Sequence, residues 1–209
     1  MPRVLSEEAV GEFREKLVDA AERLFGQHGL EAVTMRQLAA ELGVSPMTPY
    51  RYFADKDDIL AAVRTRAFTR HAEALELAFE GGANTLERAN AVGRAYLAFA
   101  LSHPEAYKLM FDAKQPDEAL RPELVAAGER SRATMTAHLK AMIDAGLLKG
   151  DPDLIGHMFW SALHGAIQLQ LAGMLSPPFD AERLSGELMR TLWLGLSAGA
   201  QTSEDPGAV

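Results

Sequence analysis

Apolar side chains recur at intervals of three and four residues along almost the whole chain, which is the period of an α-helix with one buried face. The first such run predicts an amphipathic helix of about 20 residues that ends near Gly29. Alternation with a period of two, which marks a β-strand, is almost absent. We therefore expect an all-α protein. The apolar residues of the first run are Phe13, Leu17, Ala20, Ala21, Leu24 and Phe25.

Composition limits the chemistry available to the chain. Its 209 residues allow one large domain or two small ones, and the absence of cysteine excludes disulfides, cysteine-ligated zinc and a thiol nucleophile. The net charge of -8 argues against a generally basic, nucleic-acid-coating surface. Residues 1–60 hold seven Lys and Arg against eleven Asp and Glu. Any contact with nucleic acid must therefore come from a local surface.

No segment has the pattern of a membrane span or a secretory signal. The opening residues lack an apolar core segment. The longest apolar stretch, residues 159–175, is short for a span and carries His164, Gln168 and Gln170. We expect a cytoplasmic protein.

Two short helical segments meet at Gly43, which is the pattern of a helix-turn-helix over residues 34–53. Thr34, with a glutamine three residues later, matches a capping box at the start of the first segment. Ser45 is a suitable N-cap for the second, with proline at its first position. From that cap, Pro49 removes only the first intrahelical hydrogen bond, so we expect a short α-helix there.

A longer helix is expected over residues 55–80, because Asp55 and Asp58 mark its start and two glycines follow its end. The stretch Gly81–Thr85 is then the expected boundary between two domains. Proline, glycine and aspartate signals divide the remainder into further helices. These are expected at 85–102, 104–113, 118–146, 152–175 and 180–199.

The second short segment carries side chains that suit DNA. Tyr50 and Tyr52 have hydroxyls that donate to phosphates, and Arg51 can read guanine with two hydrogen bonds. Met47 and Thr48 can contact a thymine methyl group. Alternatively, Tyr50 is partly a core residue and Arg51 is only a solvated cation.

The run TMRQLAAELGVSPMTPYRYFADKDDIL resembles the N-terminal DNA-binding domain of TetR/AcrR-type transcriptional regulators, and the resemblance covers about residues 11–71. It implies that Arg36 reaches a base edge from the helix before the turn. Pro49 departs from the aliphatic residue that the family more often has at this position. The residues that match the family's reading face, phosphate contacts and turn are Thr34, Arg36, Ser45, Met47, Thr48, Tyr50, Arg51, Tyr52 and Lys56.

The C-terminal half resembles the WHG-type domain of part of this family, whose Trp, His and Gly are Trp160, His164 and Gly165 here. The resemblance implies a ligand-binding and dimerisation domain over residues 84–200 and a small, largely apolar effector. Alternatively, the residues expected in its ligand pocket are ordinary core. They are Phe99, Tyr107, Met110, Phe111, Trp160 and His164.

The last two predicted helices are apolar over much of their circumference, so each is expected to be buried on two sides. One side suits the helical bundle and the other a two-fold interface, which implies a homodimer and a palindromic operator. The expected interface residues are Leu163, Ile167, Leu171, Leu188, Leu192 and Leu196.

The sequence lacks several motifs that are typical of enzymes. The sequence has no H-E-x-x-H, no G-x-S-x-G and no phosphate-binding or dinucleotide-binding glycine loop. We therefore expect no catalytic residue, metal or cofactor, and interpret the chain as a dimeric, ligand-responsive repressor. The alternatives are a ligand-binding or scaffold protein without specific DNA recognition and a small all-α enzyme.

Overall fold

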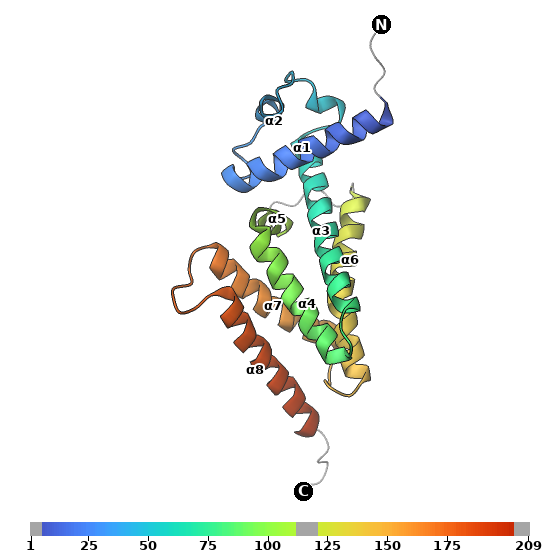
Figure 1. Ribbon diagram of the computed structural model, residues 1–209, viewed down its shortest axis with the longest axis vertical. Coiled ribbons are helices and arrows are strands. Elements are labelled where there is room, and N and C mark those ends of the chain that lie inside the picture. Colours follow the sequence, from blue (N-terminus) through green and yellow to red (C-terminus); the bar gives the residue numbers. More distant parts are fainter. Residues whose placement is uncertain (1–5, 112–120, 203–209) are drawn as a thin grey trace. The chain divides into compact units, whose positions relative to one another are not determined.

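The computed structural model describes residues 6–111 and 121–202, and these form helices and no strand (Figure 1). The predicted all-α class is confirmed. The elements in chain order are α1 (Glu7–His28), α2 (Met35–Glu41), the 3₁₀-helix η1 (Pro49–Arg51), α3 (Lys56–Glu80), α4 (Thr85–Ser102), α5 (Pro104–Met110), α6 (Pro122–Asp144), α7 (Pro152–Leu171) and α8 (Ala181–Thr202).

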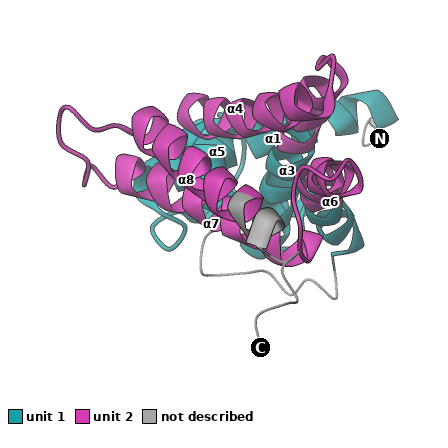
Figure 2. Ribbon diagram, turned by 90° about the horizontal axis from the view of Figure 1, so that it is seen from below, with its two compact units in different colours: residues 1–70, 103–129 teal, residues 71–102, 130–209 magenta. Residues whose placement is uncertain are grey.

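Contacts divide the chain into two compact units, coloured separately in Figure 2. Unit 1 comprises residues 1–70 and 103–129, and unit 2 comprises residues 71–102 and 130–209. Two helices, α3 and α6, contribute residues to both units. The division by contacts thus assigns α5 to the same unit as α1 and α2.

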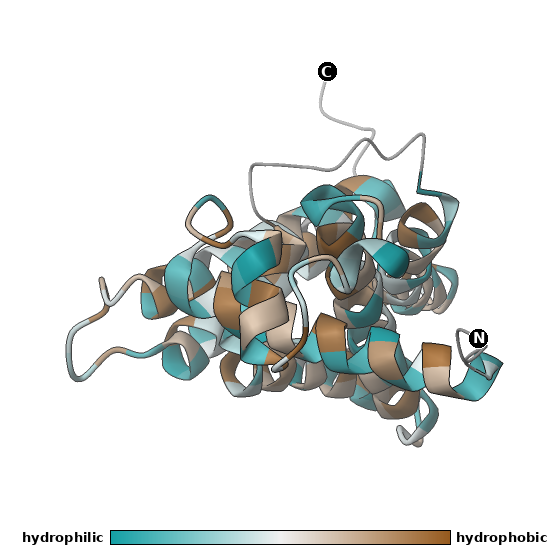
Figure 3. Ribbon diagram, turned by 90° about the horizontal axis from the view of Figure 1, so that it is seen from above, coloured by the Kyte–Doolittle hydropathy of each residue, from teal (hydrophilic) through white to brown (hydrophobic). Residues whose placement is uncertain are grey.

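Unit 1 is built around one apolar cluster to which α1, α2, α3 and α5 contribute. Helix α1 contributes Leu17 and Phe25, α2 contributes Leu38, and α5 contributes Leu109. Hydrophilic and hydrophobic residues are interspersed along each helix, as the teal and brown segments of Figure 3 show. Burial of the apolar face provides most of the stability of helices as short as α2. Helix α1 ends as predicted, with Gly29 at φ 80°.

The segment after the turn differs from the prediction. Ser45 does not cap an α-helix. Residues 46–47 form a turn, residue 48 lies in a bend, and the helix that follows is the 3₁₀ element η1. Its hydrogen bonds span three residues, from Arg51 N to Thr48 O (3.1 Å) and from Tyr52 N to Pro49 O (3.0 Å). Pro49 explains the difference, because it has no N–H with which to make the first α-helical bond back to Ser45.

Unit 2 contains α4, α7, α8 and parts of α3 and α6. Helix α7 ends at Leu171, earlier than predicted, and Gly173 follows at φ 68°. Helix α8 extends to Thr202, beyond its predicted end. Residues 112–113 and 118–120 of the predicted helices lie outside the described residues. In the described part of the chain, no helix is long and apolar enough to cross a membrane.

Candidate functional site

The helix-turn-helix begins with the predicted capping box. Thr34 Oγ1 accepts from Gln37 N (3.3 Å), and the Gln37 side chain accepts from Thr34 N (2.8 Å). The turn passes through Gly43 at φ 66°, a left-handed conformation that costs glycine little. Val44 N then donates to Ala39 O (3.0 Å) and closes the turn onto α2. This sequence of bonds sets where η1 begins relative to α2.

Most of the residues predicted to contact DNA present exposed side chains. Met47 is 68% exposed and Tyr50 is 48% exposed. Thr34, Arg36, Ser45 and Arg51 are also exposed, whereas Thr48 and Tyr52 are half-buried. Thr48 lies within hydrogen-bond distance of Ser45, with 3.0 Å between the hydroxyl oxygens. An exposed methionine and an exposed tyrosine near the turn make a surface that can contact a groove of DNA.

Two of the predicted phosphate contacts also have structural partners. Lys56 Nζ donates to Leu30 O (2.8 Å), which uses one of the three donors of an ammonium. The Tyr52 ring packs against Phe13, with 4.5 Å between centroids. The remaining Lys56 donors stay available to a phosphate oxygen.

Sequence reasoning missed Arg14, which supports η1 from α1. Its guanidinium donates to Tyr52 O and lies 4.1 Å from the centroid of the Phe53 ring. A cation over an aromatic ring adds to the attraction. The contact joins residues 38 positions apart, so no local pattern in the sequence signals it.

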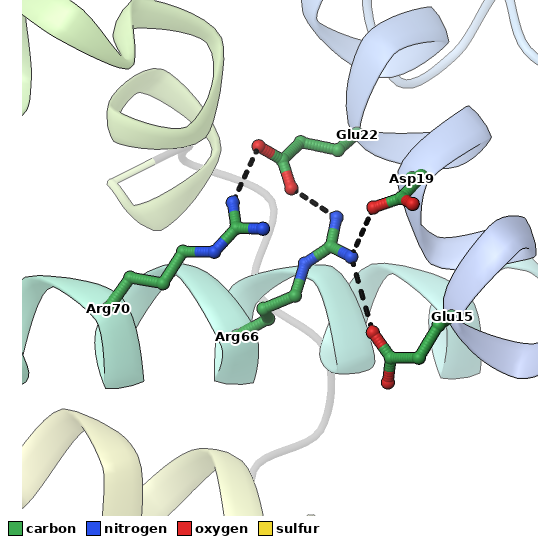
Figure 4. Close-up of polar contacts among 5 residues, drawn as sticks. All are labelled: Glu15, Asp19, Glu22, Arg66 and Arg70. Carbon is green, nitrogen blue, oxygen red and sulfur yellow. Dashed lines mark hydrogen bonds and ion pairs between the residues drawn. The ribbon is translucent and has the colours of Figure 1, made fainter. Parts of the chain in front are cut away.

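A second contact that the sequence did not reveal is an ion network between α1 and α3 (Figure 4). The Arg66 guanidinium bonds to Glu22 and to Asp19 (2.5 Å), and it lies 3.5 Å from Glu15. Arg70 adds a contact of 3.6 Å with Glu22. Burial lowers the pKa of Arg66, but the hydrogen bonds to Glu22 and Asp19 outweigh it and raise the pKa overall. The network thus ties α1 to residues 66–70 of α3.

Unit 2 contains a cavity of about 890 Å³ between α4, α6, α7 and α8. This volume lies in the range of small-molecule sites, and the lining is mainly apolar. Charged side chains in the lining are Arg94 on α4 and Glu182 and Arg190 on α8. The aromatic residues of the lining are Tyr96, Phe159, Trp160 and Trp193.

Of the six residues predicted to line a pocket, Trp160 lines this cavity. His164 lies beside it, with 5.7 Å between ring centroids. Phe99 is buried in the same unit. Tyr107, Met110 and Phe111 belong to unit 1, where the first two are buried and Phe111 contacts the ring of Phe68.

A series of side-chain contacts connects the cavity wall to α3 and α6. The Trp160 indole N–H donates to the Tyr96 hydroxyl (2.8 Å), and the Tyr96 ring meets the His71 ring edge-on at 4.9 Å. His71 Nδ1 lies 2.8 Å from Ser131 Oγ. His71 is 1% exposed, and burial lowers its pKa to about 4. His71 therefore stays neutral at physiological pH.

The five leucines and one isoleucine predicted at a dimer interface differ in burial. Leu163 and Ile167 are buried within unit 2, where Leu163 also lines the cavity. The other four are half-buried. Leu194, on α8, is 54% exposed. Helices α7 and α8 thus both present apolar surface outside the core.

Two family models match the chain. Residues 17–63 match "Bacterial regulatory proteins, tetR family", and residues 89–192 match "Tetracyclin repressor-like, C-terminal domain". Among curated proteins, the chain is 31% identical over 135 residues to the HTH-type transcriptional regulator BetI of Rhizobium meliloti (strain 1021). That match spans 63% of this chain and 66% of BetI.

Solved structures give the same result for the fold. A protein of unknown function from Rhodococcus sp. RHA1 superposes with a TM-score of 0.77 at 28% identity, covering 94% of this chain and 99% of that one. The transcriptional regulator FadR of Bacillus subtilis, solved in complex with stearoyl-CoA, superposes with a TM-score of 0.73 at 19% identity. That match covers 87% of this chain and 98% of FadR.

Proposed function

Because the chain belongs to the TetR family of bacterial transcriptional regulators, we propose that it is a cytoplasmic, dimeric repressor that a small-molecule effector releases from a palindromic operator. The observation that carries the proposal is the exposed face that follows a capped α2 and a glycine turn. Residues 11–71 form the proposed DNA-binding domain, and residues 84–200 the proposed effector-binding and dimerisation domain.

In this proposal, sequence is read by side chains on both sides of the turn. Arg36 projects from α2, whereas Met47, Thr48 and Arg51 belong to the segment after the turn. An arginine that bonds to guanine contributes about 1–3 kcal/mol of discrimination. The phosphate contacts are assigned to Thr34, Ser45, Tyr50, Tyr52 and Lys56.

The proposed dimer uses the apolar surface of α7 and α8. Leu171, Leu188, Leu192 and Leu196 are half-buried in the protomer, so a partner has apolar surface left to cover. Pairing of the same surface on two copies gives two-fold symmetry. We call the segment after the turn, residues 45–53, the reading segment. Two reading segments, one from each protomer and about 34–36 Å apart, then match successive major grooves of a palindrome.

Release requires an effector with different affinities for the DNA-bound and DNA-free states. We assign the effector to the unit 2 cavity, whose wall includes Trp160 and Tyr96. A ligand that moves Trp160 alters the packing of Tyr96 against His71, a residue of α3. Since α3 also contributes residues to unit 1, a shift of α3 changes the spacing of the reading segments.

The test of DNA recognition is fluorescence anisotropy with DNA tiles from around the protein's own gene, titrated with salt. We expect tight binding to one tile. Tyr50→Ala and Lys56→Ala should weaken binding to all sequences, and loss of the Lys56 charge should also flatten the salt dependence of binding. Arg36→Ala and Arg51→Ala should cost about 1–3 kcal/mol and relax the preference at particular base pairs.

Arg132→Ala is the matched control, because Arg132 is an exposed arginine of α6 in unit 2. If no tile, and no genomic fragment in a pull-down, binds better than random DNA, the proposal is wrong and a ligand-binding protein of this fold replaces it. Equal losses from Arg36→Ala on every operator variant would remove Arg36 from the reading face.

A further inference from the structure

The side chains that line the unit 2 cavity indicate which class of ligand can bind there. Its lining follows α4 from Leu86 to Leu101, which is about 22 Å at 1.5 Å per residue. Three methionines, Met135, Met142 and Met189, line it together with the aromatic residues. Methionine side chains adapt to irregular apolar ligands. Most of the lining therefore favours an elongated apolar body.

Arg94 interrupts this apolar lining with an uncompensated charge. Among the described residues, its guanidinium has no hydrogen-bond or ion-pair partner. The residues three and four positions away on α4 are Asn90, Ala91, Leu97 and Ala98, so the helix itself supplies no carboxylate. An exposed arginine beside an apolar cavity is a potential anion-binding group.

Asn90 strengthens this interpretation. It lies one helical turn before Arg94, also lines the cavity, and likewise has no partner within the described residues. Side chains four residues apart on a helix share a face. A guanidinium and an amide N–H₂ on one face together offer donors to both oxygens of a carboxylate.

The other two charges of the lining are already compensated. Arg190 forms an ion pair with Glu187 on its own helix, at 2.6 Å. Glu182 lies in the first turn of α8, where the helix dipole stabilises a negative charge. His138, also in the lining, is half-buried, and burial lowers its pKa, which favours the neutral imidazole. Arg94 is therefore the charge that a ligand can balance.

We propose that the cavity binds an apolar carboxylate, whose carboxylate contacts Arg94 and Asn90 while its chain lies against Trp160 and Trp193. This inference rests on the proposed function only in treating the ligand as the effector. Binding itself is independent of DNA, so the two proposals fail separately.

The chain provides its own probe, since Trp160 and Trp193 are its two tryptophans and both line the cavity. Tryptophan fluorescence of the full-length protein is titrated with decanoate, 1-decanol and decyltrimethylammonium, all below micellar concentrations. The three compounds share a chain and differ in charge. We expect decanoate to bind at least about tenfold more tightly than the other two, as a charge-assisted hydrogen bond implies.

Variants separate recognition of the carboxylate from burial of the chain. Arg94→Gln should weaken decanoate binding about tenfold and leave decanol binding unchanged, because only the carboxylate loses its partner. Arg94→Lys should retain part of the preference through its charge. Arg132→Gln is the matched control, since Arg132 is exposed in the same unit and lies outside the cavity lining.

Three results would overturn the proposal: equal binding of the three compounds, preference for the ammonium compound, or equal decanoate affinity in Arg94→Gln and the unmodified protein. If decanoate does not change the fluorescence of the tryptophans, the proposal is also wrong. Decanoate binding without operator binding would support the ligand assignment and contradict the proposed repressor. Operator binding without decanoate binding would do the reverse.

Discussion

Acid should destabilise unit 2 through His71. This side chain is 1% exposed, and its pKa is lowered to about 4 from an ordinary value of 6.5 because burial disfavours the charged form. The unfolded chain therefore binds a proton at His71 below pH 6.5, and the folded protein does not until about pH 4. The neutral His71 therefore makes its full contribution to the free energy of unfolding above pH 6.5, and this contribution is lost as the pH falls towards 4.

The size of the effect follows from the shift. At 1.36 kcal/mol for each pH unit, a shift of this size corresponds to about 3 kcal/mol of unfolding free energy. Domains of ordinary stability unfold with about 5–15 kcal/mol, so the loss is a large fraction of the total. The histidine also contacts Ser131, Tyr96 and Phe99, which hold the ring in place.

The assay is urea unfolding at several pH values from 7.5 to 4.5, at one protein concentration, followed by tryptophan fluorescence. Trp160 and Trp193 both belong to unit 2, so the signal reports on the unit that contains His71. His71→Gln removes the titrating group and should give a shallower loss of stability with acid. His28→Gln is the control, because His28 is exposed. Parallel pH profiles for His71→Gln and the unmodified protein would refute the reasoning.

Three further predictions concern the helices that position the proposed reading segment and the cavity wall. Thr34→Ala removes the capping box and should cost about 1 kcal/mol in urea unfolding followed by circular dichroism, whereas Thr34→Ser should restore it. Arg66→Met leaves the half-buried Glu22 without its main partner and should cost about 2 kcal/mol, against less than about 1 kcal/mol for Arg23→Met, whose pair with Glu41 is exposed. Equal costs for the two arginine variants would show that the α1–α3 network is not specifically stabilising. Trp160→Phe should alter the response to effector while retaining operator binding, and an unchanged dose–response in a release assay would exclude Trp160 from effector sensing.

Local signals in the sequence predicted the helices well. The capping box at Thr34, the glycine turn at Gly43 and the Asp55–Asp58 start of α3 depend on residues within a few positions of one another. The same reasoning failed after Ser45, where the expected α-helix is a 3₁₀-helix. From the sequence, the missing N–H of Pro49 is expected to remove one hydrogen bond from an α-helix. In the structure, the hydrogen bonds instead join residues three positions apart, which makes a 3₁₀-helix.

The cavity was less predictable because its lining comes from four helices. The four-residue spacing of Trp160 and His164 indicated a shared helical face, yet Trp160 lines the cavity and His164 does not appear in its lining. Arg94 and Trp193 gave no signal, since an arginine and a tryptophan in amphipathic helices are typical of ordinary surface and core. Their significance depends on which helix faces them, and that is a property of packing.

Contacts of arginines with residues far away in the sequence join the helices of unit 1, and local sequence patterns do not predict them. Arg14 bonds to Tyr52 O from α1, Arg66 joins α3 to three acids of α1, and the buried Arg64 donates to Met110 O at the end of α5. Each of these contacts links segments at least 38 residues apart, so periodicity and capping rules cannot detect it. A guanidinium suits this role because it offers five donors in a fixed plane and stays charged when partly buried. In unit 1, the sequence specifies the helices through local patterns, and these arginines specify how α1, α3, α5 and the reading segment are held together.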